Sequence, residues 1–291
     1  MSTKDPHEAK GLVLMADKVH HIMGISGGKD SSALAVYMRD RVPEMEYFFC
    51  DTGAELTETY EFLAKLEAIL GKTIHRLGDD RGFDHWLDVY RGALPSAQMR
   101  WCTKQMKIKP LEDWIGETFR DERVISYVAI RADEPQREGY LSTRSNVEVV
   151  YPFKEDGIDK EGVMKILDYA GIGLPEYYEW RTRSGCYFCF FQRKAEWVGL
   201  AERHPDLFEK AVAYEDKVNK NHGEHGSGRQ FTWSQGETLV ELISRKDEIM
   251  DKHETAMARA ARQQKNRPFI EVLSEALDDD DDTPPCQVCS L

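Results

Sequence analysis

The first 155 residues alternate short apolar runs with amphipathic stretches, and this alternation limits the possible folds more than any other feature of the chain. Five runs have the length and the β-branched and aromatic content of strands. They lie at Val19–Ile25, Glu46–Cys50, Lys72–Leu77, Val124–Ile130 and Val147–Phe153. Helical patterns lie between them, at Ser31–Arg41, Leu56–Leu70, Phe83–Tyr90 and Lys104–Phe119. Such alternation predicts an α/β fold, a parallel five-stranded sheet with helices on both faces.

The pattern changes after residue 155, where helical periodicity replaces the alternation. The expected helices lie at Lys160–Ala170, Lys194–Glu202, Asp206–Asn219 and Glu237–Gln263. Asn221–Gln230, rich in glycine and histidine, indicates a loop, and the aspartate run Asp278–Asp282 indicates a solvated, mobile tail. We therefore predict a first domain over residues 1–155, a mainly helical region over 156–276 and an acidic tail over 277–291.

Charge and hydropathy exclude several classes of protein. The formal net charge is −13, which argues against a protein that coats nucleic acid but allows a local basic groove. Arg100, Lys104, Lys107 and Lys109 indicate such a groove, because their spacing places several cations on one helical face. The chain lacks a run of about 18 apolar residues and its start lacks the apolar segment of a signal peptide. We expect a cytoplasmic protein with no membrane partner.

A glycine turn joins the first expected strand to the first expected helix. Its sequence is Ser26-Gly27-Gly28-Lys29-Asp30-Ser31. The backbone N–H groups of such a turn, followed by a helix N-terminus, form a cradle for an anion, to which a lysine adds charge and the serines add hydroxyl groups. The spacing matches neither the Walker A loop nor the GxGxxG fingerprint.

A strand followed by SGGKDS and a helix resembles the pyrophosphate loop of the N-type ATP pyrophosphatases, the adenine nucleotide alpha hydrolase-like superfamily. This resemblance implies that Ser26, Gly27, Gly28, Lys29, Asp30 and Ser31 bind the phosphates of ATP. The family cleaves ATP between its α- and β-phosphates. Lys29 and Asp30 are therefore also expected to act in catalysis, Lys29 by stabilising the charge that develops on the pyrophosphate.

Two further segments resemble the phosphoadenosine phosphosulfate (PAPS) reductase-like branch of that superfamily. Asp51-Thr52-Gly53, followed by Glu58-Thr59, is similar to its DTG…ET segment, and Ile130–Glu134 is similar to its GIRADE segment. Asp51, Thr52 and Gly53 are therefore expected at the nucleotide, and Arg131 is expected to neutralise the leaving phosphate. Read locally, the carboxylates of Asp30 and Asp51 are candidate ligands of Mg²⁺ shared with the phosphates.

Six cysteines supply a second indication of function. The segment Arg100–Leu111, with Cys102, and the pair Cys186/Cys189 resemble the two halves of the cluster site of iron–sulfur adenosine phosphosulfate (APS) reductases. Trp101 stands where those reductases have a further cysteine. The resemblance implies a [4Fe–4S] cluster on Cys102, Cys186 and Cys189, because three thiolates can anchor a cubane. Zinc, or thiols without metal, are the alternatives.

The sequence indicates less about the roles of the remaining cysteines and basic residues. Cys50 lies in an apolar run and is expected to be a buried, inert thiol. A second pair, Cys286 and Cys289, lies in the acidic tail beyond the aspartate run and is expected to act in catalysis, by attacking sulfur, by carrying a persulfide or by capping the cluster. An unused thiol pair is the alternative. Four basic residues beside the first pair could extend the positive surface: Arg181, Arg183, Arg193 and Lys194.

These features together favour an ATP-dependent sulfurtransferase-like enzyme of the PAPS reductase-like branch. It would adenylate an acceptor and then transfer sulfur, with ATP or PAPS, a nucleic-acid acceptor and a sulfur-donor protein as candidate partners. The phosphorothioate-DNA sulfurtransferases are similar members of that branch. A true PAPS or APS reductase is the first alternative. A nucleotide-binding regulatory protein without catalysis is the second.

Overall fold

The computed structural model describes residues 18–137, 139, 142–224 and 231–263 of the chain. Its centre is a five-stranded parallel sheet of order β3-β2-β1-β4-β5. The strands are β1 (Val19–Gly24), β2 (Glu46–Cys50), β3 (Ile74–Leu77), β4 (Arg123–Tyr127) and β5 (Val147–Val150). The predicted α/β class and the five parallel strands are confirmed.

Successive residues of the central strands point to opposite faces of the sheet, and both faces are covered. Met23 and Tyr47 pack on one face with α1 (Lys29–Met38), α2 (Thr57–Leu70) and α7 (Lys160–Tyr169). Ile22 and Phe48 pack on the other face with α5 (Lys109–Thr118). This two-sided burial explains why the strands read as continuous apolar runs. It also explains why the sequence predicted them well.

The fifth strand ends earlier than predicted. The chain leaves the sheet after Val150, and α6 (Pro152–Glu155) begins where a strand to Phe153 was expected. Pro152 has no N–H for a ladder, and its fixed φ suits the first position of a helix. Phe153 is nevertheless fully buried, because the helix directs it into the core beneath the sheet.

The helix expected to start at Lys104 begins at Trp101 and contains a wide turn. It consists of α4 (Trp101–Thr103), the π-helical segment η1 (Lys104–Ile108) and α5, which carries Pro110 in its first turn. A proline lacks the N–H that a continuous α-helix needs, and the wide turn immediately before it absorbs the irregularity.

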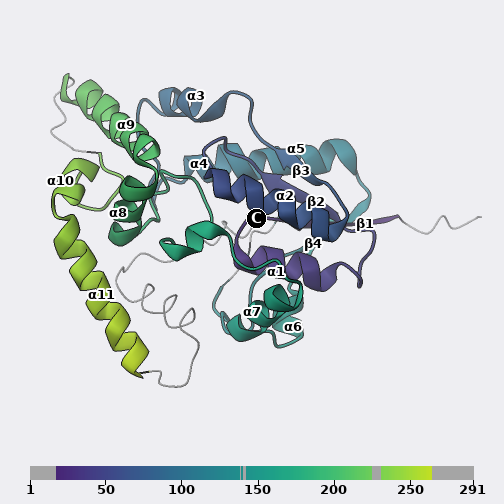
Figure 1. Ribbon diagram of the computed structural model, residues 1–291. Coiled ribbons are helices and arrows are strands. Elements are labelled where there is room, and N and C mark those ends of the chain that lie inside the picture. The colour runs from purple at the N-terminus through teal and green to yellow at the C-terminus, as the bar shows by residue number, and fades with distance from the viewer. Residues whose placement is uncertain (1–17, 138, 140–141, 225–230, 264–291) are drawn as a thin grey trace, which may run out of the picture.

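Helices α8–α11 form a lobe beside the sheet (Figure 1). Their bounds are α8 (Lys194–Arg203), α9 (Pro205–Glu224), α10 (Leu239–Ser244) and α11 (Lys246–Gln263). The helix expected over Glu237–Gln263 is thus two helices, which separate at Arg245. α9 extends to Glu224, into the stretch predicted as a loop.

The core of this lobe draws on distant parts of the sequence. It includes Phe83 and Trp86 of α3 (Gly82–Val89), Trp101 of α4, and Trp197 of α8. Conversely, α7, which follows residue 155, belongs to the core of the sheet. The hydrophobic cores therefore cross the predicted boundary at residue 155. The tail with Cys286 and Cys289 lies outside the described residues, and within them no helix combines the length and apolarity needed to cross a bilayer.

Candidate functional site

The six residues Ser26–Ser31, here called the glycine loop, connect β1 to α1 at the point where the strand order reverses. Such a reversal creates the crevice in which open α/β sheets bind ligands. Gly27 has φ +76°, and a Cβ there would lie 2.7 Å from Thr59 Cγ2. The Ser26 N–H donates to Ser31 Oγ (3.1 Å), and Ser32 Oγ donates to the Gly28 carbonyl (2.8 Å). The loop is therefore closed by its own hydroxyl groups.

Asp30 links the glycine loop to the end of β4. Its Oδ1 accepts from Arg131 Nη1 at 3.1 Å, and its Oδ2 lies 3.6 Å from Lys29 Nζ. Burial alone would raise the pKa of this carboxyl, but the charges of Lys29 and Arg131 outweigh burial and hold the pKa below its ordinary value. Asp30 is therefore ionised at neutral pH, and the predicted neighbours Lys29, Asp30 and Arg131 do come together.

Arg131 is surrounded by carboxylates. Besides Asp30, it donates from Nε to Asp133 (2.9 Å), and its Nη2 lies 3.7 Å from Glu134 Oε1. These charges raise its pKa although burial opposes them. The guanidinium thus fixes the loop after β4 against the glycine loop, and its predicted contact with a leaving phosphate stays a prediction.

The Asp51-Thr52-Gly53 segment follows β2 at the same edge of the sheet. Asp51 Oδ1 accepts from the Gly53 N–H (2.9 Å) and from the Tyr60 hydroxyl (2.8 Å). Asp51 therefore organises its own turn, whereas Asp30 is paired with Arg131. The structure gives the two predicted Mg²⁺ ligands separate partners.

Thr52 connects this turn to the first cysteine pair. Its Oγ1 lies 3.0 Å from Cys186 Sγ and donates to Glu55 Oε1 at 3.1 Å. Cys186 Sγ also donates to that oxygen, at 3.7 Å. Burial, followed by the charge of Glu55, raises the pKa of the Cys186 thiol well above its ordinary value. The sulfur is therefore a protonated thiol at neutral pH.

Residues 181–189, here called the cysteine loop, are held by contacts rather than by a helix or strand. Arg181, only 1% exposed, donates from Nη1 to the Gly185 carbonyl (2.9 Å) and from Nη2 to the Cys186 carbonyl (2.8 Å). The Tyr187 N–H donates to the carbonyl of Ala54 (2.8 Å), which lies beside the Asp51–Gly53 turn. The cysteine loop is thereby fixed to the segment that follows β2, at the same end of the sheet as the glycine loop.

Two tyrosines that sequence reasoning missed reach the glycine loop from the other half of the chain. They belong to the 3₁₀ helix η2 (Glu176–Glu179). The Tyr177 hydroxyl donates to the Gly27 carbonyl (2.8 Å), and the Lys29 N–H donates to Tyr178 Oη (3.0 Å). One turn of 3₁₀ helix has no periodic sequence pattern. The only sequence signal for the two tyrosines was that they lie close to the Cys186/Cys189 pair in the chain.

The other cysteines occupy different surroundings. Cys102 and Cys186 pack against the same hydrophobic cluster, and the influence of Cys189 on the Cys186 pKa indicates that these two are neighbours. Within the described residues, however, no three His, Cys, Asp or Glu side chains are arranged to hold one metal ion. Cys50 is 1% exposed and its pKa is raised to about 12 by burial, which agrees with the predicted inert thiol.

The predicted positive surface is smaller than the sequence indicated. Arg181 and Arg193 are buried: Arg181 bonds to carbonyls of the cysteine loop, and Arg193 is the residue that precedes α8 at its N-cap. Arg100 and Arg183 both lie over the ring of Phe191, at 5.0 and 5.6 Å from its centroid. These two guanidinium groups bring the segments of Cys102 and Cys189 together.

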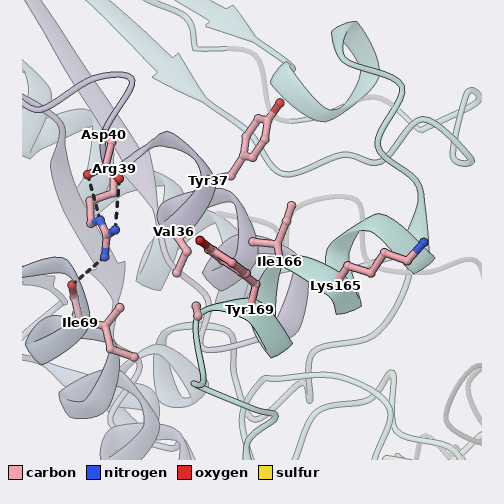
Figure 2. A pocket seen from close by; sticks show the side chains of 9 residues that line it. Val36, Tyr37, Arg39, Asp40, Ile69, Lys165, Ile166 and Tyr169 are labelled. Atoms are coloured by element: carbon pink, nitrogen blue, oxygen red, sulfur yellow. Dashed lines mark hydrogen bonds and ion pairs between the residues drawn. The ribbon is translucent and has the colours of Figure 1, made fainter.

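A cavity of about 540 Å³ lies at the other end of α1 (Figure 2). It is lined by Val36, Tyr37, Arg39, Asp40, Ile69, Lys165, Ile166, Tyr169 and Ala170. Arg39 donates to Asp40 and to the Ile69 carbonyl at its rim. Because a ten-residue helix is about 15 Å long, this cavity is separate from the glycine loop.

Comparison with known proteins agrees with the geometry. Residues 20–154 match the family model of the phosphoadenosine phosphosulfate reductase domain, which confirms the predicted resemblance over that segment. An uncharacterized protein of Methanocaldococcus jannaschii is 25% identical over 193 residues, 64% of this chain and 45% of that protein. A tRNA-specific 2-thiouridylase of Ligilactobacillus salivarius is 24% identical over 241 residues, 72% of this chain and 62% of that protein.

A similar solved structure is the phosphoadenylyl-sulfate reductase of Candida auris in complex with phosphate. It is 14% identical, with a TM-score of 0.45, and the match covers 57% of this chain and 81% of that chain. The chain spans less than half the length of the archaeal relatives, 45% of one and 40% of another.

Proposed function

Because residues 20–154 carry a phosphoadenosine phosphosulfate reductase domain, we propose that the protein is an ATP-dependent sulfurtransferase of this family. One observation carries the proposal: Cys186 Sγ lies 3.0 Å from Thr52 Oγ1, in the turn after β2, at the same sheet edge as the glycine loop. A thiol at the edge where an α/β sheet binds a nucleotide suits sulfur transfer to an adenylated acceptor.

The proposed reaction has two steps. An oxygen of the acceptor attacks the α-phosphorus of Mg²⁺-bound ATP, and the bond to the pyrophosphate breaks. Hydrosulfide from a sulfur donor then attacks the activated carbon, and the oxygen leaves with AMP. Lys29 and the N–H groups at the start of α1 stabilise the charge that develops on the pyrophosphate.

We propose three cysteines around the cysteine loop as donors for an iron–sulfur cluster, although the described residues are not already gathered into a three-ligand metal site. Cys102 and Cys186 share one hydrophobic cluster, and Cys189 adds a third soft thiol. Beside Cys186, the Oε2 atom of Glu55 is buried, and no group in the described part of the chain donates to it. Cys102, Cys186 and Cys189 would hold the cluster. When bound, it would supply an iron to which sulfide can coordinate.

A nucleic acid is the proposed acceptor. The 2-thiouridylase relative is named for its action on tRNA, and Arg100 and Arg183 lie beside the cysteine-bearing segments. Guanidinium groups pair well with phosphodiesters. Because the formal net charge of the chain is −13, we expect the nucleic acid to contact only this local basic patch.

The deciding experiment is ATP–pyrophosphate exchange with anaerobically purified full-length protein and bulk tRNA. Exchange that depends on tRNA supports the proposal. Nucleotide binding without exchange or sulfite release would instead indicate a regulatory protein. Iron and sulfide analysis and an absorption spectrum of the same preparation test the cluster separately.

A PAPS or APS reductase is the second candidate, and the family model itself favours it. A reductase releases sulfite from PAPS or APS in the presence of a thiol reductant and needs no ATP exchange. Thiol-dependent sulfite release with no exchange activity would replace the sulfurtransferase with the reductase.

A further inference from the structure

Hydroxyl groups from three segments converge on Gly28. A Cβ placed on this glycine would lie 3.0 Å from Ser184 Oγ and 3.4 Å from both Ser26 Oγ and Tyr178 Oη. Ser26 belongs to the glycine loop, Tyr178 to η2, and Ser184 to the cysteine loop. The lining of the cradle at Gly28 therefore includes hydroxyls from beyond residue 170 as well as from the loop itself.

The hydroxyl of Tyr178 lies beside Lys29 and could donate a hydrogen bond to an anion there. Its oxygen accepts the N–H of Lys29 at 3.0 Å, and Lys29 Nζ lies 5.5 Å from the centroid of its ring. The hydroxyl also has a hydrogen bond with Tyr177 that lowers its pKa, as a bond accepted by the oxygen does, so its own proton is still available for donation. Burial raises the pKa of Tyr178 above its ordinary value, so this proton is retained at neutral pH.

We propose that Tyr178 is a phosphate-binding residue of the nucleotide site, whose hydroxyl donates its proton to a phosphate oxygen held on the glycine loop. The inference rests on the proposed ATP site and adds a ligand from η2 to it. The contact would also set the position of the phosphate relative to the cysteine loop. The Arg181 N–H donates to the Tyr177 carbonyl (2.9 Å), and the Arg181 side chain donates to the Cys186 carbonyl. A phosphate bound by Tyr178 is thereby placed relative to Cys186.

The test is Tyr178→Phe in the full chain, with binding of ATP, inorganic pyrophosphate and adenosine measured by calorimetry. The phenylalanine ring preserves the stacking on Tyr177, whose centroid lies 5.0 Å away. We expect roughly tenfold weaker binding of ATP and pyrophosphate, as for the loss of one hydrogen bond to a charged group, with adenosine affinity unchanged. Tyr169→Phe, at a tyrosine that is 95% exposed, is the matched control and should change nothing.

A second readout tests placement. In metal-free protein, where Cys186 is an uncoordinated thiol, pyrophosphate should slow its alkylation, followed by mass spectrometry, but much less in Tyr178→Phe. Equal weakening for adenosine and pyrophosphate would show that Tyr178 only supports the fold. Tighter binding in the variant would show that its hydroxyl competes with phosphate for the Lys29 N–H. Either result overturns the inference.

The outcomes also separate this inference from the proposed function. If Lys29→Ala loses pyrophosphate binding while Tyr178→Phe binds normally, the inference is wrong and the ATP site stands. If the unaltered protein binds neither ATP nor pyrophosphate, the proposed function fails, and the role of Tyr178 fails with it.

Discussion

The glycine loop and the cysteine loop meet at one end of the sheet, but they are stabilised in different ways. The glycine loop closes on itself, through the bond from the Ser26 N–H to Ser31 Oγ, five residues away. The cysteine loop depends on a buried arginine and on Ala54, which is 133 residues from its partner Tyr187. Both loops combine local and long-range contacts, since Arg181 lies within the cysteine loop and Tyr177 bonds to Gly27 across 150 residues. The difference is that the glycine loop runs directly into a helix, whereas the cysteine loop has no helix or strand.

This difference predicts how each loop responds when a mutation removes one of its contacts. A locally closed loop at a helix N-terminus should keep its shape when distant contacts are lost. A loop without secondary structure, held by a few individual hydrogen bonds, should open at a lower free-energy cost. The following predictions test that contrast.

The largest effect is expected for metal content. Cys102→Ser, Cys186→Ser and Cys189→Ser should each lose most of the iron, because a cubane held by three thiolates has no spare ligand. Cys50→Ser is the matched control and should retain iron, since Cys50 lies in β2 within a separate core. Iron and sulfide analysis of anaerobically purified variants measures this. Full iron in any of the three variants would remove that cysteine from the ligand set.

Loss of the loop lysine comes next. Lys29→Ala should weaken ATP binding and exchange by roughly 10- to 100-fold, since it removes one charge-assisted contact with phosphate. Lys165→Ala is the matched control, because Lys165 belongs to α7 and lines the cavity that lies far from the glycine loop. Calorimetry and exchange kinetics give both numbers. Unchanged values in a folded Lys29→Ala protein would contradict the phosphate assignment of the loop.

Arg181→Met tests the cysteine loop alone. The variant leaves the Gly185 and Cys186 carbonyls without their donors, and each buried unsatisfied group costs about 1–3 kcal/mol. We expect stability in urea to fall by about 2–4 kcal/mol, while affinity for ATP changes less than threefold. Arg203→Met, at a side chain that is 48% exposed, should be nearly neutral. A large loss of ATP affinity would show that the two loops are not separable.

The smallest effect concerns a second locally closed turn, after β3. Asp79 accepts from Arg81 and from Trp86 Nε1, and the hydrogen bonds from Arg81, first among these effects, lower its pKa from 3.8 to about 2. A lowered carboxyl pKa stabilises the folded state above pH 3.8, and this contribution is lost as the pH falls toward 2. Asp79→Asn should therefore be less stable in urea at pH 6, with the difference shrinking below pH 4. A difference that stays constant with pH would assign the effect to shape rather than charge.

The sequence predicted the elements of the sheet because each strand is buried on two faces. Ile22 and Met23 point to opposite cores, so the apolar run that marks β1 is required by both. The sequence also placed the segments of Asp51 and Arg131 at the ligand edge of the sheet, but it did not predict the ion pair between Asp30 and Arg131. Periodicity could not foresee that Pro152 would end β5, or that the helix expected at Glu237 would divide at Arg245.

The site roles that escaped prediction depend on individual contacts rather than on a periodic sequence pattern. Tyr178 reaches Lys29 across 149 residues, and no local pattern marks it. Arg181 was expected at the surface because arginine is usually exposed, but two backbone carbonyls make its burial favourable. The sequence did name Cys102 and Cys186 as candidate ligands, but no local pattern showed that the two share one hydrophobic cluster.

The π-helical turn Lys104–Ile108 fixes the angular relation between Cys102 and α5. A π turn holds one residue more than an α turn, so it rotates everything before it by about 100° relative to everything after it. Removing one residue from this turn would let the helix run on evenly and would swing Cys102 to a different side of the helix. The extra residue therefore determines the direction in which the Cys102 thiol points. Its gain or loss during evolution could change that direction without altering the sheet.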